Sequence, residues 1–303
     1  MTELTFFQQK ISALLPNVEC RFWETMAKHT SFKIGGPVEI MVFPKTAQEL
    51  SAALKAAKEL NCAYRILGAG TNVLAPDAGI SGMVICLKDA LDGIQQLDEK
   101  TIRVMAGVTM TRAAVFAANL GLSGLEFAHG IPGTVGGGVY MNAGAYGGEI
   151  CQVCTQVAVM DQAGNISLRS NGEMDFSYRH SCLEEEDGIV VYADFQLTPA
   201  PLDEIKAKMQ ELMTKRKTSQ PLDMPSAGSA FKRPTGGYAA AMIDQAGLKG
   251  FRVGGAEIST KHAGFAVNAG GATAADVREL LRQVSDKVYE NTGIRLEPEV
   301  RVW

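Results

Sequence analysis

Three glycine clusters are the segments of this sequence whose residue types and spacing could bind a charged ligand. They are Ile34-Gly-Gly-Pro37, Leu67-Gly-Ala-Gly-Thr-Asn72 and Gly130-Ile-Pro-Gly-Thr-Val-Gly-Gly-Gly138, and they hold many of the 32 glycines in the 303 residues. Glycine allows the backbone to turn sharply, and successive N–H groups in such a turn can point at one anion. Three loops of this kind suit the diphosphate of a dinucleotide.

The second cluster is neither a Rossmann phosphate loop nor a Walker loop. A Rossmann loop opens a helix, whose N-terminus then meets the pyrophosphate. Here Pro76 and Gly79 interrupt the residues after Gly70 and prevent a helix, and the third glycine of the fingerprint is missing. A Walker loop would need Gly-Lys-Ser/Thr to follow, and it does not. Ordinary glycine-rich turns remain the alternative for any single loop.

One cysteine pair has the spacing of a zinc or redox site. Cys151-Gln-Val-Cys154 has no second pair to complete it. We expect Ile150–Met160 to be a strand, on which residues three apart point to opposite faces and cannot converge on a metal. We therefore predict no metal site, and reduced thiols that pack as small hydrophobic side chains. The six cysteines are Cys20, Cys62, Cys86, Cys151, Cys154 and Cys182.

Helices and strands alternate around these loops and must position them. Thr46-Ala-Gln-Glu49 has the spacing of a capping box, and apolar residues follow it with helical period. By the same criteria, helices are expected at 46–61, 111–121, 202–217 and 273–290. Short apolar runs predict strands at 39–43, 63–67, 83–87, 101–106, 153–160 and 189–197. The chain should therefore combine small sheets with a few helices.

The expected secondary structure changes at Pro199-Ala-Pro201, which predicts a domain boundary. Before it the chain is rich in strands, and after it the chain carries long amphipathic helices. We expect a first part at 1–90, which includes an N-terminal helix, a second at 91–200 and a third at 201–303. A length of 303 residues is compatible with such a division.

The charge balance argues against nucleic acid or membrane partners. Lys and Arg number 29 against 33 Asp and Glu, a net charge of −4, and no long basic run is present. No apolar run approaches the roughly 20 residues that cross a bilayer, and no basic leader precedes an apolar stretch at the start. These features lead us to expect a cytoplasmic protein.

The loops belong to an ordered set of motifs that resembles the UDP-N-acetylenolpyruvoylglucosamine reductases, also called UDP-N-acetylmuramate dehydrogenases. The motifs are His29-Thr-Ser-Phe-Lys-Ile-Gly-Gly36, Leu67–Asn72, Gly130–Gly138, Met141-Asn-Ala-Gly-Ala-Tyr-Gly147, Tyr178-Arg179, Ala227-Gly-Ser-Ala-Phe-Lys232 and Leu296-Glu-Pro-Glu-Val300. The resemblance runs from about residue 20 to the C-terminus. His180–Gly188 leads almost directly into the next expected strand, without the extra substrate-capping loop of some members, which is typical of the shorter type II subgroup.

That resemblance implies an α+β protein with a vanillyl-alcohol-oxidase-type FAD-binding fold. Residues 1–90 and 91–200 would be two lobes that hold FAD without a covalent bond, and 201–303 would bind substrate, with the C-terminal tail returning to the active site. The implied cofactor contacts are Gly35, Gly36, Gly68, Ala69, Gly70, Thr71, Asn72, Gly133, Thr134, Gly136, Gly137, Asn142 and Ala143. Backbone N–H groups would complement the charge of the dinucleotide there.

The implied reaction uses NADPH and enzyme-bound FAD to reduce UDP-N-acetylglucosamine enolpyruvate to UDP-N-acetylmuramate. This product is a precursor of peptidoglycan, and hence of cell-wall synthesis, cell shape and division. The implied protein is a monomer. By resemblance, Lys217, Lys232, Lys261 and His262 are candidates for binding the substrate.

Arg179, Ser229 and Glu299 match the catalytic positions of the family. Arg179 would hold a carboxylate as its charge grows, and Ser229 would protonate C2 of the substrate. Because a serine hydroxyl is a poor acid, something must stabilise its alkoxide or replace its proton, and Lys232 is a candidate. Glu299, rather than the competitor Glu297, would polarise the enolate or relay protons.

Two alternatives from other classes remain. Another FAD enzyme of the same superfamily, an oxidase or dehydrogenase, would share the FAD loops, and attachment of the flavin through His29 or His129 would favour it. A non-catalytic flavin-binding module would bind FAD without turning over NADPH.

Overall fold

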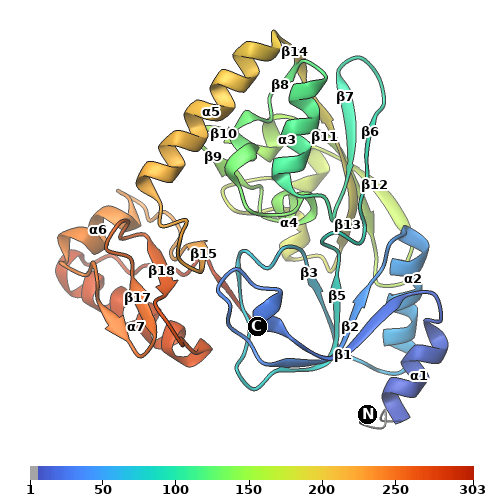
Figure 1. Ribbon diagram of the computed structural model, residues 1–303, viewed down its shortest axis with the longest axis horizontal. Coiled ribbons are helices and arrows are strands. Elements are labelled where there is room, and N and C mark those ends of the chain that lie inside the picture. Colours follow the sequence, from blue (N-terminus) through green and yellow to red (C-terminus); the bar gives the residue numbers. More distant parts are fainter. Residues whose placement is uncertain (1–5) are drawn as a thin grey trace. The chain divides into compact units, whose positions relative to one another are not determined.

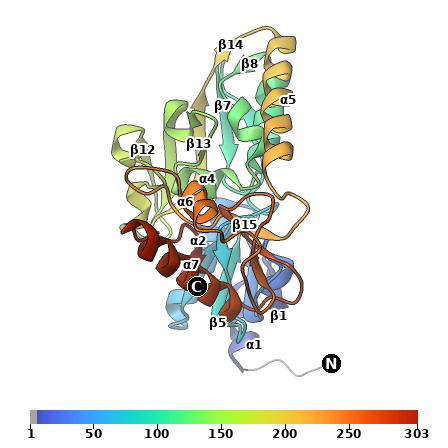
Figure 2. The same ribbon diagram turned by 90° about the vertical axis from the view of Figure 1, so that its left-hand side faces the viewer.

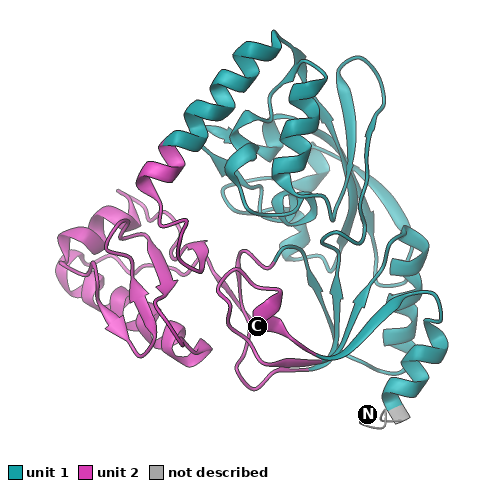
Figure 3. Cartoon of the chain, viewed as in Figure 1, with its two compact units in different colours: residues 1–23, 39–69, 81–214 teal, residues 24–38, 70–80, 215–303 magenta. Residues whose placement is uncertain are grey.

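The protein forms two compact units in a computed structural model that describes residues 6–303 (Figures 1 and 3). Unit 1 contains the chain up to residue 23 together with 39–69 and 81–214, and unit 2 contains 24–38, 70–80 and 215–303.

This grouping differs from the ranges 1–90, 91–200 and 201–303 expected from sequence. Two early segments, 24–38 and 70–80, belong with the C-terminal part because their hydrogen-bond partners lie there. The Ser31 hydroxyl donates to the carbonyl of Ser226 at 2.5 Å, and Asn268 Nδ2 donates to the carbonyl of Phe32 at 3.1 Å.

The first sheet has the strand order β1-β2-β5-β3, and most of it lies in unit 1. Its strands are β1 (Glu19–Thr25), β2 (Pro37–Phe43), β5 (Ile80–Cys86) and β3 (Tyr64–Leu67), of which β3 and β5 are parallel. Helix α2 (Ala47–Glu59) buries Leu50 and Leu54 in the same core as Ile40 and Ile85. The expected cap is half formed: the Thr46 side chain accepts from Glu49 N, but the Glu49 carboxylate accepts from Lys45 N.

The second sheet of unit 1 is antiparallel and has the order β12-β11-β13-β7-β6. In Figure 2, β12, β13 and β7 can be followed in this order. The strands are β12 (Ile166–Ser170), β11 (Cys154–Met160), β13 (Ile189–Gln196), β7 (Thr101–Met105) and β6 (Ile94–Gln96). This part of unit 1 also contains α3 (Met110–Asn119), α4 (Val135–Tyr140) and two short pairs, β8 (Leu122–Ser123) with β14 (Thr198–Pro199) and β9 (Gly144–Ala145) with β10 (Gly148–Glu149). Helix α1 (Phe6–Leu14) contacts α2.

Unit 2 is built on a sheet of order β15-β18-β17-β16. Its elements are β15 (Ser226–Ser229), β16 (Arg252–Val253), β17 (Ala256–Ile258), β18 (Phe265–Asn268), α6 (Ala239–Gln245) and α7 (Ala274–Thr292). Helix α7 buries its apolar side, which consists of Val277, Leu280, Leu281, Val284 and Val288. Helix α5 (Leu202–Ser219) begins in unit 1 and ends in unit 2.

Asp77 and strand β4 also join the early segments of unit 2 to its C-terminal part. The carboxylate of Asp77 accepts from Ala274 N at 2.8 Å and from Ala275 N at 3.2 Å, so it satisfies donors at the start of α7. Strand β4 (Val73–Leu74) pairs in parallel with β19 (Arg301–Val302) near the end of the chain.

All six cysteines are free thiols, as expected, but the strand proposed over Ile150–Met160 was wrong at its start. Residues Ile150–Gln152 form a 3₁₀ turn, because Asn142 Oδ1 accepts from Cys151 N and the Glu149 side chain caps the turn. Burial raises the pKa of Cys151 and raises that of Cys154 to about 12, which keeps both thiols protonated. Among the described residues, no helix is long and apolar enough to cross a membrane.

Candidate functional site

Residues 68–72 offer a run of free backbone donors. None of their five N–H groups donates a hydrogen bond to another group in the described part of the chain. Gly70, which is buried, has a φ of +61°, and a Cβ there would collide with the carbonyl oxygen of His29. Buried N–H groups are almost always paired, so a run of unpaired ones is suited to a bound anion. Five unpaired amides in one short segment could bind the diphosphate of a dinucleotide.

The cluster at Gly35 and Gly36 lies where two loops of unit 2 pack together. Gly36 N donates to the carbonyl of Pro76 at 2.9 Å, so this N–H is already used. A Cβ on Gly36 would collide with the carbonyl oxygen of Asp77, and one on Gly35 would lie 2.7 Å from the Cβ atoms of both Met26 and Ala75. These glycines therefore permit two loops of unit 2 to pack closely.

The third cluster also uses its N–H groups internally. At the start of α4, Gly136 N donates to the carbonyl of Ala106 at 2.9 Å, and Gly137 N donates to Thr134 Oγ1 at 3.4 Å. Met110 N donates to the carbonyl of Gly133 at 2.9 Å. A Cβ on Gly136 would lie 2.9 Å from the Cβ of Ala106. The N–H groups of Gly136 and Gly137 are thus used within the protein, and the cofactor contacts implied for this cluster stay a prediction.

Asn142 and Ala143 lie directly after α4 and are bonded to their own surroundings. Asn142 is 1% exposed, and its Oδ1 accepts from Cys151 N at 3.0 Å. Its Nδ2 donates to the carbonyl of Ser177 at 2.9 Å and to the Glu149 carboxylate at 3.2 Å. Ala143 N donates to the carbonyl of Gly138. Asn142 therefore fixes one end of the turn that carries Arg179.

Arg179 lies in a strained two-residue turn of unit 1. Ser177 and His180 exchange two backbone hydrogen bonds of 3.2 Å, so Tyr178 and Arg179 form the turn between them. Arg179 has a φ of +57°, a backbone angle that residues other than glycine rarely adopt. Its Nη2 donates to the carbonyl of Gly144 at 3.3 Å, and its guanidinium lies 5.0 Å from the centre of the Tyr178 ring.

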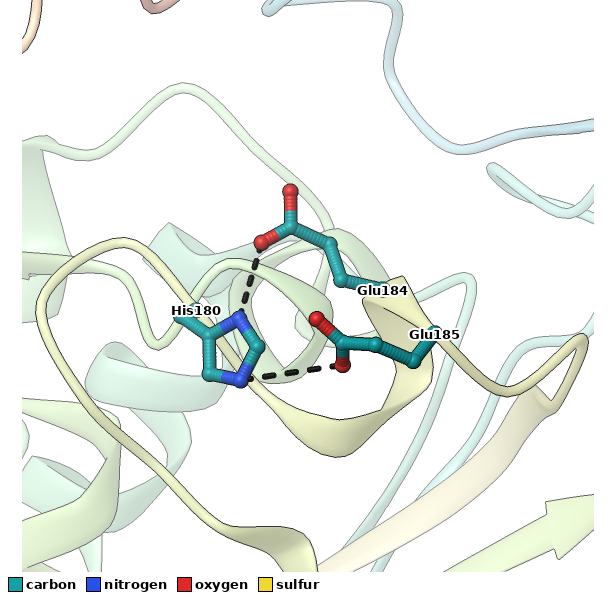
Figure 4. Close-up of side chains that lie close together, drawn as sticks. All are labelled: His180, Glu184 and Glu185. Carbon is teal, nitrogen blue, oxygen red and sulfur yellow. Dashed lines mark hydrogen bonds and ion pairs between the residues drawn. The ribbon is translucent and has the colours of Figure 1, made fainter.

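The other end of this turn is held by an acidic cluster (Figure 4). His180 Nδ1 lies 2.9 Å from Glu184, and Nε2 lies 3.7 Å from Glu185. The hydroxyl of Ser181, which is fully buried, donates to the carbonyl of Tyr140. The side chains of His180, Glu184 and Glu185 could each offer one atom to a cation. Their contacts are those of ordinary hydrogen bonds and ion pairs, which need no metal to explain them.

Ser229 is presented to solvent at the end of β15 in unit 2. The pairing of β15 with β18 slips between Ser226 and Ser229, and Gly228 in this bulge has a φ of +77°. Ser229 is exposed, and its hydroxyl has no hydrogen-bond partner among residues 6–303. A hydroxyl with no structural contact is available to a ligand.

Glu299 lies beside Ser229 because of backbone pairing. Phe231 forms an antiparallel bridge with Pro298, and Glu299 N donates to the carbonyl of Ala230 at 3.0 Å. Glu299 is therefore opposite the residue that follows Ser229. The competitor Glu297 is bonded elsewhere, since its carboxylate accepts from Lys232 Nζ at 2.6 Å.

The other candidate substrate residues have contrasting contacts. Lys232, expected as a neighbour of the Ser229 hydroxyl, is the ion-pair partner of Glu297. Lys261 Nζ donates to the backbone carbonyl of Lys217 at 2.7 Å. The Lys217 side chain is exposed and has no ion-pair partner in the described chain. Of the three lysines, Lys232 is thus the one neutralised by an ion pair in the described chain.

His262 has a defined protonation state. Its Nδ1 accepts from Gly264 N at 3.1 Å, and burial lowers the pKa of the ring. The ring also packs edge-on against Phe265, 5.1 Å between centres. His262 is therefore neutral near pH 7, with Nε2 left as its donor. It can donate a hydrogen bond to a ligand but cannot add positive charge.

Ser31 is a contributor to the site that the sequence did not single out. Its N–H donates to the carbonyl of Gly70 at 3.0 Å, and its hydroxyl donates to the carbonyl of Ser226. It thus joins residues 68–72 to β15, the strand that ends in Ser229. No local pattern indicates such a contact, because Ser31 and Ser226 are 195 positions apart.

Comparisons with known proteins match two regions of the chain. Residues 38–168 match the family model of an FAD binding domain, and 220–303 match that of the C-terminal domain of UDP-N-acetylenolpyruvoylglucosamine reductase. The reductase of Syntrophomonas wolfei is 44% identical over 293 residues, 97% of this chain and 98% of its own. That of Streptococcus pneumoniae is 41% identical over 295 residues, 97% of each chain. The crystal structure of the Thermus caldophilus reductase has a TM-score of 0.79 and 38% identity, and the match covers 95% of this chain and 99% of that one.

Proposed function

The chain belongs to the UDP-N-acetylenolpyruvoylglucosamine reductase family, and from this premise we propose that Arg179, Ser229 and Glu299 carry out its chemistry. The protein is an FAD-dependent oxidoreductase with a vanillyl-alcohol-oxidase-type, α+β fold. It reduces UDP-N-acetylglucosamine enolpyruvate to UDP-N-acetylmuramate in peptidoglycan synthesis, with NADPH as the reductant. When bound, FAD supplies the transfer of hydride from NADPH to C3 of the enolpyruvyl ether.

Ser229 acts as the acid that protonates C2 of the substrate. Addition of hydride at C3 leaves carbanion or enolate character at C2, which requires a proton. The support for Ser229 is its exposed hydroxyl, which has no partner in the described chain and is presented by a bulge of β15. Transfer of this proton leaves an alkoxide, so a second group must restore the proton.

Glu299 is the group that we assign to the return of the proton. The hydrogen bond from Glu299 N to the Ala230 carbonyl holds Glu299 opposite the segment that carries Ser229. Lys232, the other candidate, is neutralised by Glu297. A carboxylic acid can either donate to the serine oxygen through water or donate to the enolate itself.

Arg179 stabilises the negative charge that grows on the enolate and its carboxylate. A guanidinium can donate two parallel hydrogen bonds to one carboxylate, and its charge does not depend on pH. The strained backbone of Arg179, fixed by Asn142 and by the His180 cluster, is the observation that favours a functional role over a surface salt bridge. Lys217, Lys261 and His262 are proposed to contact the rest of the substrate.

Residues 68–72 are proposed to hold the diphosphate of FAD. Alanine at Gly70 would collide with the His29 carbonyl and displace this segment, so we expect the dissociation constant for FAD to rise at least tenfold. Gly271→Ala is the matched control: Gly271 has a similar φ of +66°, with no atom within 4 Å of an added Cβ. Titration of the FAD-free variants, followed by flavin fluorescence, measures both constants. Equal losses in the two variants would show that backbone strain alone is responsible.

Several finer properties extend the proposal. We propose a monomeric, cytoplasmic enzyme of the type II subgroup that binds FAD non-covalently and contributes to cell shape and division through the cell wall. Residues 1–90 and 91–200 would serve as the cofactor lobes, and 201–303 would bind substrate.

The single observation that carries the proposal is the run of unpaired N–H groups at 68–72 in a chain of this family. The test is anaerobic. NADPH should abolish the flavin absorbance at about 450 nm, and the enolpyruvyl UDP-sugar should restore it without oxygen. Recovery only on addition of oxygen would indicate an oxidase, and failure of NADPH to change the spectrum would indicate a binding module.

A further inference from the structure

Asn72 connects the anion-binding segment to the chain end that carries Glu299. Its Nδ2 donates to the carbonyl of Glu299 at 3.2 Å, and its own carbonyl accepts from Arg301 N at 3.0 Å. The contact continues as the pairing of β4 with β19, and Trp303 N donates to the carbonyl of Leu74 at 3.1 Å. The last residues of the chain therefore lie along residues 72–74.

The peptide groups of Glu299 are consequently held from two directions. Its N–H is bonded to the carbonyl of Ala230, which follows Ser229, and its carbonyl is bonded to the side chain of Asn72. These two bonds fix the backbone from which the Glu299 carboxyl group projects. Loss of either one would allow the carboxyl group to move relative to Ser229.

We propose that Asn72 is a positioning residue for Glu299, so that the segment assigned to the FAD diphosphate also orders the proton-transfer machinery. The inference rests on the proposed role of Glu299. It adds to the cofactor contact that the resemblance implied for Asn72, because the side-chain amide donates within unit 2. The backbone N–H of Asn72 remains among the free donors of residues 68–72.

Ser31 supports the same view from the other side of the segment. It joins Gly70 to Ser226 on β15, as Asn72 joins its own segment to Glu299. The strand that ends in Ser229 and the chain that carries Glu299 are therefore both attached to residues 70–72. A single short segment can set the relative positions of the two groups.

The test uses Asn72→Asp, which preserves size but replaces the donating amide with a carboxylate that faces a carbonyl. Because Asn72 lies in the segment assigned to the FAD diphosphate, the dissociation constant for FAD is measured first and both half-reactions are then followed at saturating FAD. We expect the substrate-driven recovery of flavin absorbance to slow by about tenfold to a hundredfold more than the reduction by NADPH does. Asn72→Ala removes the donor without adding repulsion and should give a smaller effect of the same kind. Asn268→Asp is the matched control, because Asn268 Nδ2 also donates to a backbone carbonyl of unit 2, that of Phe32.

A double-variant cycle with Glu299→Gln separates positioning from general damage. If Asn72 acts through Glu299, adding Asn72→Asp to Glu299→Gln should slow the substrate-driven half-reaction by less than about twofold further. Full additivity, or an effect as large in Asn268→Asp, would overturn the inference.

Hydrogen exchange gives a readout that does not depend on activity. In the FAD-free full-length protein, the amides of residues 299–303 should exchange at least tenfold faster in Asn72→Asp, because the Glu299 carbonyl loses its partner. Unchanged exchange would refute the positioning role. If exchange rises while Glu299→Gln is fully active, the assignment of Glu299 fails but the structural contact stands, so the two failures can be told apart.

Discussion

Ser229→Ala is expected to slow the substrate-driven recovery of flavin absorbance by about 10²–10⁴-fold and to leave the reaction with NADPH within about twofold of the parent protein. Only the second half-reaction needs a proton at C2, so removal of the hydroxyl should separate the two halves. The Ser229 hydroxyl has no partner in the described chain, so the free energy of unfolding should change by less than about 0.5 kcal/mol. Anaerobic stopped-flow absorbance measures each half-reaction, and thermal unfolding checks the fold.

Ser226→Ala is the control for Ser229→Ala. Ser226 lies on the same strand, and its contact with Ser31 uses the backbone carbonyl, which alanine keeps. We expect both half-reactions of this variant to match those of the parent. Equal slowing of both halves in Ser229→Ala would contradict the role as an acid and indicate a disturbed flavin site instead.

The sequence predicted the main elements because their patterns are periodic and local. The helix expected at 46–61 is observed at 47–59 and that at 273–290 is observed at 274–292. Both have a threonine N-cap, of which the one at Thr46 was predicted. The pattern failed at Ile150–Gln152, where apolar composition favours a strand. The local backbone is set there by side chains of Asn142 and Glu149, and such contacts leave no periodic signal.

The candidate site was only partly predictable for a different reason. Composition identifies a glycine loop but does not show where its N–H groups point. Residues 68–72 leave their donors free, whereas Gly36 and Gly136 donate to carbonyls of Pro76 and Ala106. The two kinds of loop look alike in sequence, because glycine serves both close packing and anion binding.

Contacts between distant segments were beyond the reach of any local pattern. Asn72 and Glu299 are separated by 227 positions, and Asp77 and Ala274 by 197. Such contacts explain why 24–38 and 70–80 belong to unit 2. Two of the glycine clusters are therefore wholly or partly built into the unit that carries Ser229 and Glu299.

Arg179→Lys is expected to slow the substrate-driven half-reaction by about 10²–10³-fold while the FAD content and the reaction with NADPH stay unchanged. Lysine keeps the positive charge and suffers the same strain at a φ of +57°, so the backbone cost is matched. It loses the planar fork that donates two hydrogen bonds to a carboxylate. The loss should appear both in the rate at saturating substrate and in the substrate concentration needed for half-saturation.

Arg169→Lys provides the comparison for Arg179→Lys, because Arg169 is a half-buried arginine of unit 1 that pairs with Glu186 at 2.8 Å. An ion pair of this kind contributes up to about 1 kcal/mol, so we expect normal activity and nearly normal stability. If Arg179→Lys lost FAD or unfolded, Arg179 would be a structural residue. If it retained full activity, charge alone would suffice and the strained turn would need another explanation.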